Sequence, residues 1–210
     1  MKENQKTIET ILVLIEYLRS EKIHHSRRVS EFTKIILKEA VGTFQEISLT
    51  EQEQECIVSC ALLHDMGENA LPDCVLYQSG KLTDKEQELY RTHPLRGEEM
   101  AGMLSLILDK RYVDCLKNIC RYHHERYDGG GYPDRLSGEE IPFEAQIVGL
   151  AEAFDEMISE HLYKHAYSCD EAYSRIIHGE CGIFSSRLIG CFIRVKNELE
   201  QAIEDMKSPS

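Results

Sequence analysis

Adjacent histidine and acidic residues occur where apolar helical patterns end. His64 and Asp65 follow the apolar run 60–63, and His123 and His124 end another such run. An imidazole and a carboxylate are costly to bury at the inner end of an apolar helix unless a strong partner neutralises them, and a metal ion is such a partner. Four further candidate ligands lie on three other segments, namely His25, His93, Glu152 and Asp155.

Together these side chains offer more nitrogen and oxygen donors than one tetrahedral metal site needs. A donor set without thiolates favours two first-row ions, iron or manganese before zinc, with Asp65 as the natural bridge. Two metal ions about 3.5 to 4 Å apart activate a bridging hydroxide and neutralise the oxygens of a phosphoryl group. The predicted reaction is phosphoester hydrolysis. Each residue alone also has an ordinary interpretation, such as a histidine–aspartate hydrogen bond that ends a helix, or a histidine in a surface turn.

Hydrophobic spacing predicts that helices position these residues. Four of the expected helices are defined by their ranges or starts, namely 6–19, 24–40, 112–122 and 145–159. A further helix starts in the capping sequence 48–53 and carries His64 and Asp65 at its end, a short one follows 83–86, and two more lie within 169–206. Another starts at Pro94, and its apolar stripe consists of Met100, Met103, Leu104 and Ile107. Segment 71–81 is expected to be irregular. Pro94 is expected to bias His93 away from helical geometry.

Two local patterns suggest how the donors are presented. Segment 127–134 contains three consecutive glycines and a proline, so its backbone can come close to a ligand. A flexible linker is the alternative, but the flanking aromatic residues and the preceding histidine pair favour a functional loop. Glu152 and Asp155 are three residues apart and share a helix face. The segment before them is apolar, so at least one is expected to point inward, where it needs a cation.

Composition bounds the class of protein. A chain of 210 residues with 42% hydrophobic content can bury one core, which predicts a single domain. The eight cysteines include no CxxC pair and are expected to be reduced core thiols. A net charge of -13 argues against nucleic-acid polymers and membranes as partners. The apolar run 11–15 is far shorter than a membrane span, which predicts a soluble, cytoplasmic protein.

Several longer motifs resemble the HD-GYP subgroup of the HD-domain metal-dependent phosphohydrolases, which are bacterial cyclic di-GMP phosphodiesterases. The motifs are His25-Ser26-Arg27-Arg28-Val29, Leu62-Leu63-His64-Asp65-Met66-Gly67, Gly80-Lys81-Leu82-Thr83, Thr92-His93-Pro94, the string His123-His124-Glu125-Arg126-Tyr127-Asp128-Gly129-Gly130-Gly131-Tyr132-Pro133, and Gly138-Glu139-Glu140-Ile141-Pro142. The string that ends in Gly-Tyr-Pro is the most specific of these, whereas the His-Asp pair alone is not specific.

The resemblance implies an all-α fold, a helical bundle around a di- or trinuclear metal site. One HD-GYP-like domain, 1–210, would comprise an N-terminal helix (1–20), the metal-binding core with the Gly-Tyr-Pro loop (21–165) and C-terminal helices (166–210). The implied metal ligands are His25, His64, Asp65, His93, His123, His124, Glu152 and, in a three-metal site, Glu21. Asp65 and Asp155 would be catalytic, and the implied substrate-binding residues are Arg126, Gly131, Tyr132, Pro133, His161, Lys164 and Glu68. The cofactors would be two or three divalent ions, with zinc, magnesium or nickel as alternatives to iron or manganese.

Three positions depart from the family pattern. Glu68 replaces a lysine and is expected to repel a phosphate, His161 replaces an arginine, and Glu152 replaces an aspartate. The expected function is metal-dependent hydrolysis of cyclic di-GMP or a related cyclic dinucleotide through a metal-bridging hydroxide. The alternatives are a catalytically weak relative that binds nucleotides or signalling proteins through its Gly-Tyr-Pro loop, and an HD phosphohydrolase of another nucleotide or small phosphoester.

Overall fold

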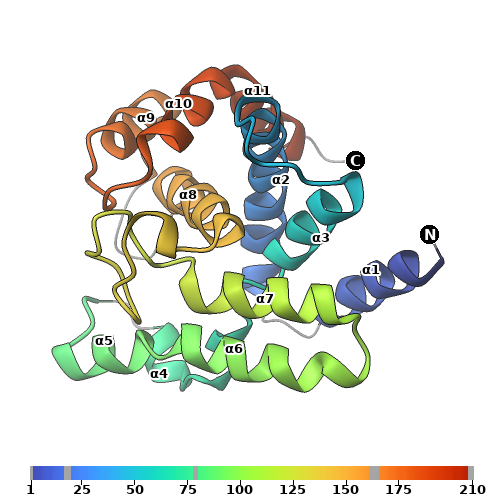
Figure 1. The fold of residues 1–210 in the computed structure, drawn as a ribbon. Helices are drawn as coiled ribbons and strands as arrows, with labels where there is room; N and C mark the ends of the chain where they lie inside the picture. The colour runs from blue at the N-terminus through green and yellow to red at the C-terminus, as the bar shows by residue number, and fades with distance from the viewer. Residues whose placement is uncertain (1, 17–19, 78–79, 161–165, 208–210) are drawn as a thin grey trace.

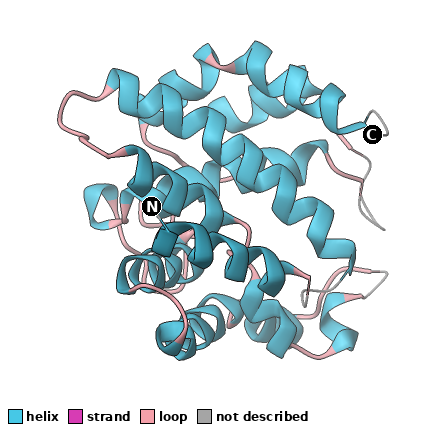
Figure 2. Cartoon of the chain, turned by 90° about the vertical axis from the view of Figure 1, so that its right-hand side faces the viewer, coloured by secondary structure: helices cyan, strands magenta, loops and turns pink. Residues whose placement is uncertain are grey.

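Helices α2 (Ser20–Thr43) and α8 (Phe143–Ile158) form the centre of the fold (Figure 1). The computed structural model describes residues 2–16, 20–77, 80–160 and 166–207. The remaining α-helices are α1 (Lys2–Ile15), α3 (Glu51–Ala61), α4 (Asp73–Leu76), α5 (Asp84–Tyr90), α6 (His93–Met103), α7 (Lys110–Tyr122), α9 (Cys169–Ile177), α10 (Ser186–Arg194) and α11 (Lys196–Lys207). No strand occurs within the described ranges (Figure 2), so the predicted all-α class is confirmed.

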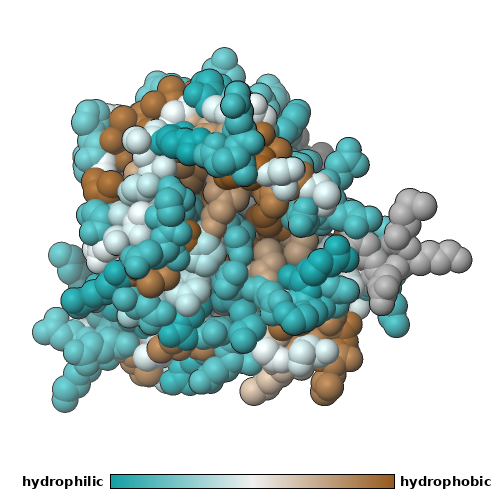
Figure 3. Space-filling view, in the orientation of Figure 1, coloured by the Kyte–Doolittle hydropathy of each residue, from teal (hydrophilic) through white to brown (hydrophobic). Residues whose placement is uncertain are grey.

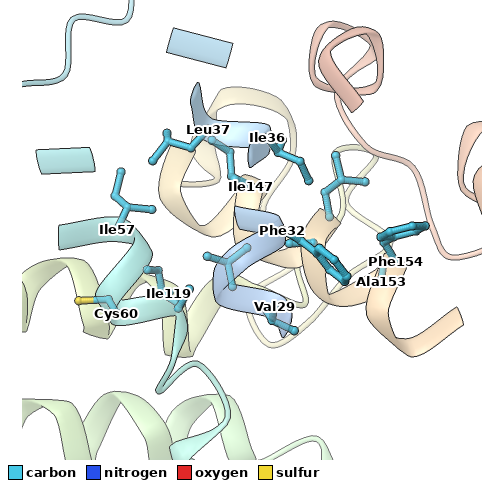
Figure 4. Packing of buried hydrophobic residues seen from close by; sticks show 14 of the residues in the cluster. Val29, Phe32, Ile36, Leu37, Ile57, Cys60, Ile119, Ile147, Ala153 and Phe154 are labelled. Carbon is cyan, nitrogen blue, oxygen red and sulfur yellow. The ribbon is translucent and has the colours of Figure 1, made fainter. Parts of the chain in front are cut away.

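The core forms because α8 is apolar on nearly every side and is surrounded by other helices. Phe32 of α2 and Phe154 of α8 pack with ring centroids 5.2 Å apart, and Ile147 lies close to Ile36 in the same cluster (Figure 4). Helix α2 also contacts α3, α10 and α11, while α7 joins α3, α6 and α8. Side chains at the ends of α3, α6 and α7 can therefore meet near the middle of α8.

Local sequence signals fix several helix starts. Thr50 and Glu53 form a capping box at the start of α3, and Thr83 and Glu86 form another at the start of α5. Helix α3 ends at Ala61, earlier than expected, so His64 and Asp65 lie in the turn that leads into the 3-10 helix η1 (Met66–Ala70).

Other expectations about the elements were wrong. The segment expected to be irregular contains α4, which starts directly after Pro72. His93 is the first residue of α6, because a proline in the first turn of a helix removes an N–H that has no intrahelical partner there. The C-terminal part forms three helices rather than two, since the chain turns at Gly179–Gly182 and again at Val195.

The apolar stripe predicted after Pro94 also fails at its end. Met103, Leu106 and Ile107 are 73%, 92% and 58% exposed. Apolar side chains also gather at the lower right of Figure 3, over the region where α6 ends in Figure 1. Met100 and Leu104 of the predicted stripe do pack against the core. Two small buried residues, Gly97 and Ala101, allow α6 to lie against α7. None of the described helices combines the length and apolar character that crossing a bilayer requires.

Candidate metal centre

Asp65 is positioned by an unusually close approach between η1 and α6. A Cβ added at Gly67 would lie 2.0 Å from the backbone oxygen of His93 and 2.5 Å from the nitrogen of Gly97. Only glycine allows two backbones to come this close. The contact brings the Asp65 carboxylate to the start of α6, where it meets His93.

Three buried histidines are oriented by backbone carbonyls. Nδ1 of His64 lies 2.9 Å from the oxygen of Ala61, Nδ1 of His93 lies 2.9 Å from that of Tyr90, and Nδ1 of His123 lies 2.8 Å from that of Ile119. A carbonyl oxygen can only accept, so Nδ1 carries the proton in each neutral ring and Nε2 keeps a lone pair. All three Nε2 atoms are therefore prepared to bind a cation.

Asp65 is shared by two groups of imidazoles. The three-histidine group consists of His93, His123 and His124, and Asp65 Oδ1 lies 3.3 Å from Nε2 of His93 and 3.4 Å from that of His123. The two-histidine group consists of His25 and His64, whose Nε2 atoms lie 3.8 and 3.4 Å from Asp65 Oδ2. Each oxygen of one carboxylate thus faces a different group.

The residues in both groups, with Asp65, form the donor cluster, and its chemistry fits divalent cations. Nε2 atoms approach one another within 3.1 to 3.4 Å. Asp65 Oδ1 and Glu152 Oε2 are buried and have no hydrogen-bond partner among the described residues. His64, His93 and His123 are fully buried. Converging lone pairs and buried carboxylate oxygens are stable only if protons or cations lie between them.

Without cations, protons have to compensate this charge. Burial opposes a charged His64, but the Asp65 carboxylate raises its pKa to about 9. Burial together with the negative charge of Asp65 raises the pKa of Glu152 to about 8. The three-histidine group behaves in the opposite way, since burial lowers the pKa of His123 to about 4 and that of His124 well below its ordinary value.

Asp155 lies behind His25 rather than at the surface of the site. Its carboxylate is fully buried and accepts from His25 Nδ1 at 2.7 Å and from Arg28 Nη2 at 2.9 Å. Burial alone would raise the pKa of Asp155, but the hydrogen bonds from His25 and Arg28 lower it. The sequence-based expectation of a catalytic residue near the phosphates does not match this position, because a carboxylate with no exposed surface orients His25 instead.

The Gly-Tyr-Pro loop is held against the donor cluster. The Glu125 carboxylate accepts three backbone N–H groups, those of Asp134, Arg135 and Leu136, at 2.7, 3.0 and 3.1 Å. A Cβ at Gly131 would lie 2.4 Å from Glu125 Cα. These contacts argue against the flexible linker considered above.

Tyr132 covers one edge of the cluster. Its ring stacks on His124 with centroids 4.6 Å apart and an interplanar angle of 22°, and Pro133 beside it is half-buried. Arg126, expected to bind substrate, donates from Nη1 to the oxygens of His123 and Glu125 at 3.0 and 2.9 Å, and from Nε to that of Cys181 at 2.9 Å. These bonds make Arg126 a structural link, because backbone carbonyls accept three of its five N–H groups.

A cavity of about 850 Å³ opens beside the cluster, and its lining includes Lys22, His25, His124 and Glu152. Glu152 Oε1 lies 3.7 Å from His124 Nε2, so the structure brings this acid to the edge of the cluster. The side chain of Glu21, and all of His161 and Lys164, lie outside the described residues.

Glu68 does not present the unpaired negative charge expected from its sequence position. It accepts a hydrogen bond from the Tyr90 hydroxyl at 2.9 Å, and Lys22 Nζ lies 2.9 Å from its other oxygen. Burial disfavours a charged Lys22, but the carboxylates of Glu68 and Asp65 raise its pKa. The sequence predicted no role for Lys22 or Arg28, although both are three residues from His25 and share its helix face.

Comparison with known proteins places these features in a family. The model of the HD domain family matches residues 13–180. The cyclic di-GMP phosphodiesterase response regulator RpfG of Xanthomonas campestris is 39% identical over 157 residues, which cover 75% of this chain and 40% of that protein. A cyclic di-GMP phosphodiesterase of Vibrio cholerae is 34% identical over 194 residues, covering 91% of this chain and 39% of that protein.

The solved structures agree in fold. Bd1817, an HDG"Y"P protein from Bdellovibrio bacteriovorus, superposes with a TM-score of 0.61 at 20% identity, covering 87% of this chain and 52% of that one. The chain spans about 40% of the length of the two curated relatives. The expected relationship to HD-GYP proteins is confirmed. With a family model matched over most of its length, the chain belongs to the HD domain family.

Proposed function

We propose that this chain hydrolyses a phosphodiester bond of a cyclic dinucleotide at a centre of two divalent metal ions. The observation that carries the proposal is that both oxygens of Asp65 face imidazole groups, with His93 on one side and His64 on the other. A carboxylate shared in this way is the arrangement that a pair of metal ions requires.

The residues that would hold the ions follow from the two groups. Asp65, His93, His123 and His124 would hold one ion, and Asp65, His25 and His64 the other. Glu152 adds a carboxylate at the edge of the three-histidine group. Imidazole and carboxylate donors without thiolates favour iron or manganese. Such ions supply water activation and charge neutralisation at a phosphoryl group.

The protein side chains contribute orientation and shielding. Backbone carbonyls and Asp155 fix the imidazole rings, while Tyr132 stacks on His124 and covers the cluster on the side of the Gly-Tyr-Pro loop. The buried rings of His64, His93 and His123 are closed to solvent. A substrate phosphate would therefore approach from the cavity side, where His25, His124 and Glu152 lie.

The substrate class comes from the relatives and from the size of the cavity. Among the relatives, 3'3'-cGAMP-specific phosphodiesterase 2 of Vibrio cholerae is 30% identical over 141 residues, which cover 67% of this chain and 26% of that protein. A cavity of about 850 Å³ lies within the range of ligand pockets and can hold a cyclic dinucleotide.

The test is to incubate protein loaded with manganese or ferrous iron with cyclic di-GMP and, separately, with 3'3'-cGAMP. We expect a linear product by nucleotide chromatography, and none after metal removal with a chelator or in the Asp65→Ala variant. Nucleotide binding without any hydrolysis by metal-loaded protein would contradict the proposal and favour a binding module.

A further inference from the structure

Lys22 places a positive charge where the cavity meets Asp65. Its Nζ lies 2.9 Å from Glu68 Oε2 and 4.0 Å from Asp65 Oδ2. The Lys22 side chain is 34% exposed, whereas that of Glu68 is 3% exposed. Both residues line the cavity. The Lys22 side chain is thus partly open to the cavity, whereas the Glu68 carboxylate is buried behind it.

Glu68 and Tyr90 hold this ammonium. The Tyr90 hydroxyl donates to Glu68 Oε1 at 2.9 Å, and Lys22 Nζ lies 3.2 Å from the same oxygen. A buried carboxylate needs a compensating cation. An ammonium has three N–H donors, so contacts to the two oxygens of Glu68 leave at least one N–H for another acceptor.

The arginines that line the cavity are engaged elsewhere. Arg28 donates to Asp155 and to Ser159, and Arg126 donates to backbone carbonyls. Among the lysines and arginines of the described residues, Lys22 alone has a side-chain nitrogen within 4.0 Å of the Asp65 carboxylate. An anion held beside the shared carboxylate would therefore meet Lys22.

We propose that Lys22 binds a phosphoryl oxygen of the substrate beside Asp65, and that Glu68 and Tyr90 position its ammonium for this contact. The proposal rests on the proposed function and names a residue that recognises the phosphate in the same site. The competing interpretation is an ion pair that only joins α2 to η1.

The two interpretations are distinguished by variants that remove the charges of Lys22 and Glu68 together, so that no unpaired charge stays buried. The double variant Lys22→Gln/Glu68→Gln removes both charges, whereas Glu68→Gln alone keeps the lysine. Lys34→Gln is the matched control, because Lys34 is an exposed lysine on the same helix that also pairs with a glutamate, Glu31. The measurement is the affinity of manganese-loaded protein for inorganic phosphate, by broadening of the phosphorus NMR signal. Metal content and unfolding temperature are measured in parallel.

We expect the double variant to bind phosphate about tenfold more weakly, with unchanged metal content, because a charged hydrogen bond to the ligand is lost. Glu68→Gln should weaken binding by about threefold at most, since the lysine remains but is held less firmly. Lys34→Gln should bind phosphate as the unaltered protein does. Unchanged phosphate affinity in the double variant, or an equal loss in Glu68→Gln, would overturn the role of Lys22.

Two single variants keep the inference testable if the double variant does not fold. Lys22→Arg retains the positive charge and should keep phosphate affinity within about threefold, whereas Lys22→Gln should lose about tenfold. Equal affinities in these two variants would overturn the proposal. Phosphate binding does not require turnover. A chain that binds phosphate through Lys22 but hydrolyses no cyclic dinucleotide would therefore contradict the proposed function alone.

Discussion

Two buried clusters of metal-binding residue types lie close to helices α3 and α7, and they differ in orientation. The thiol cluster consists of Cys56, Cys60 and Cys115, whose sulfur atoms lie within 4.8 Å of one another. Sγ of Cys60 donates to the oxygen of Tyr112 at 3.5 Å. Burial raises the pKa of Cys60, which keeps its thiol protonated, whereas hydrogen bonds with the thiols of Cys115 and Cys60 lower the pKa of Cys56 to about 5. In the donor cluster, by contrast, backbone carbonyls take the Nδ1 protons and the Nε2 lone pairs converge.

The second difference is access. None of the three cysteines lines the cavity, whereas His25 and His124 do. The neutral Cys60 thiol donates to a carbonyl and needs no cation, and a Cys56 thiolate would accept hydrogen bonds from its two neighbouring thiols. Residue type and proximity are therefore insufficient to define a metal site. The donors must also have free lone pairs and an entry path.

Loss of Asp65 should have the largest effect on metal binding by the donor cluster. Because its two oxygens face different groups, Asp65→Ala is expected to weaken metal binding at both positions and to lower turnover by about a hundredfold or more. Elemental analysis and nucleotide chromatography give the two readouts. His24→Ala, an exposed neighbour of His25, is the control. Full metal occupancy in Asp65→Ala would refute the shared-carboxylate arrangement.

Loss of Asp155 should have a smaller, one-sided effect. Asp155→Asn removes the charge that orients His25, so metal affinity in the two-histidine group should fall by about 10- to 100-fold while the three-histidine group keeps its ion. Calorimetric titration with manganese would resolve the two steps. Asp114→Asn, on the exposed side of α7, is the control. An equal loss in both steps would show that Asp155 supports the fold rather than one position.

The two groups should also differ in their dependence on pH. The raised pKa of His64, about 9, means that a proton must leave when a cation binds there, so affinity should rise with pH by about tenfold per unit below pH 9. His123 and His124 have lowered pKa values and are neutral already, so the imidazoles of their group should respond weakly between pH 6 and 8, about the physiological range. Glu152, whose pKa is raised to about 8, would itself release a proton at the edge of that group, so the comparison uses the Glu152→Gln variant. Titration in buffers of different ionisation enthalpy counts the released protons. Equal proton release in both steps of the Glu152→Gln variant would contradict this difference.

The smallest effect on metal binding is expected from the thiol cluster. Cys60→Ala should leave metal content unchanged and reduce the free energy of unfolding by about 1 to 2 kcal/mol, because it leaves a small cavity in the core. Chemical denaturation measures the loss, and Cys74→Ala at an exposed position is the control. Metal content that falls in Cys60→Ala would make the thiol cluster a metal site as well.

Much of the fold was predictable because its signals are local. The capping boxes at Thr50 and Thr83 start α3 and α5 where the sequence indicates. Helix α6 was only partly predicted, because its apolar periodicity continues past Met103 although the helix ends there. Periodicity records which residues can face a core, but the packing of small residues such as Gly97 against α7 decides where that core ends.

The sequence alone predicted the candidate donor residues and the family to which the chain belongs. Only the tertiary structure showed that His25 is buried in the donor cluster, whereas its neighbour His24 is exposed. It also divided Asp65 between two imidazole groups and paired Glu68 with Lys22. The physical reason is distance along the chain. Helical spacing fixes neighbours three and four residues apart, whereas contacts between segments more than 30 residues apart depend on how the helices pack.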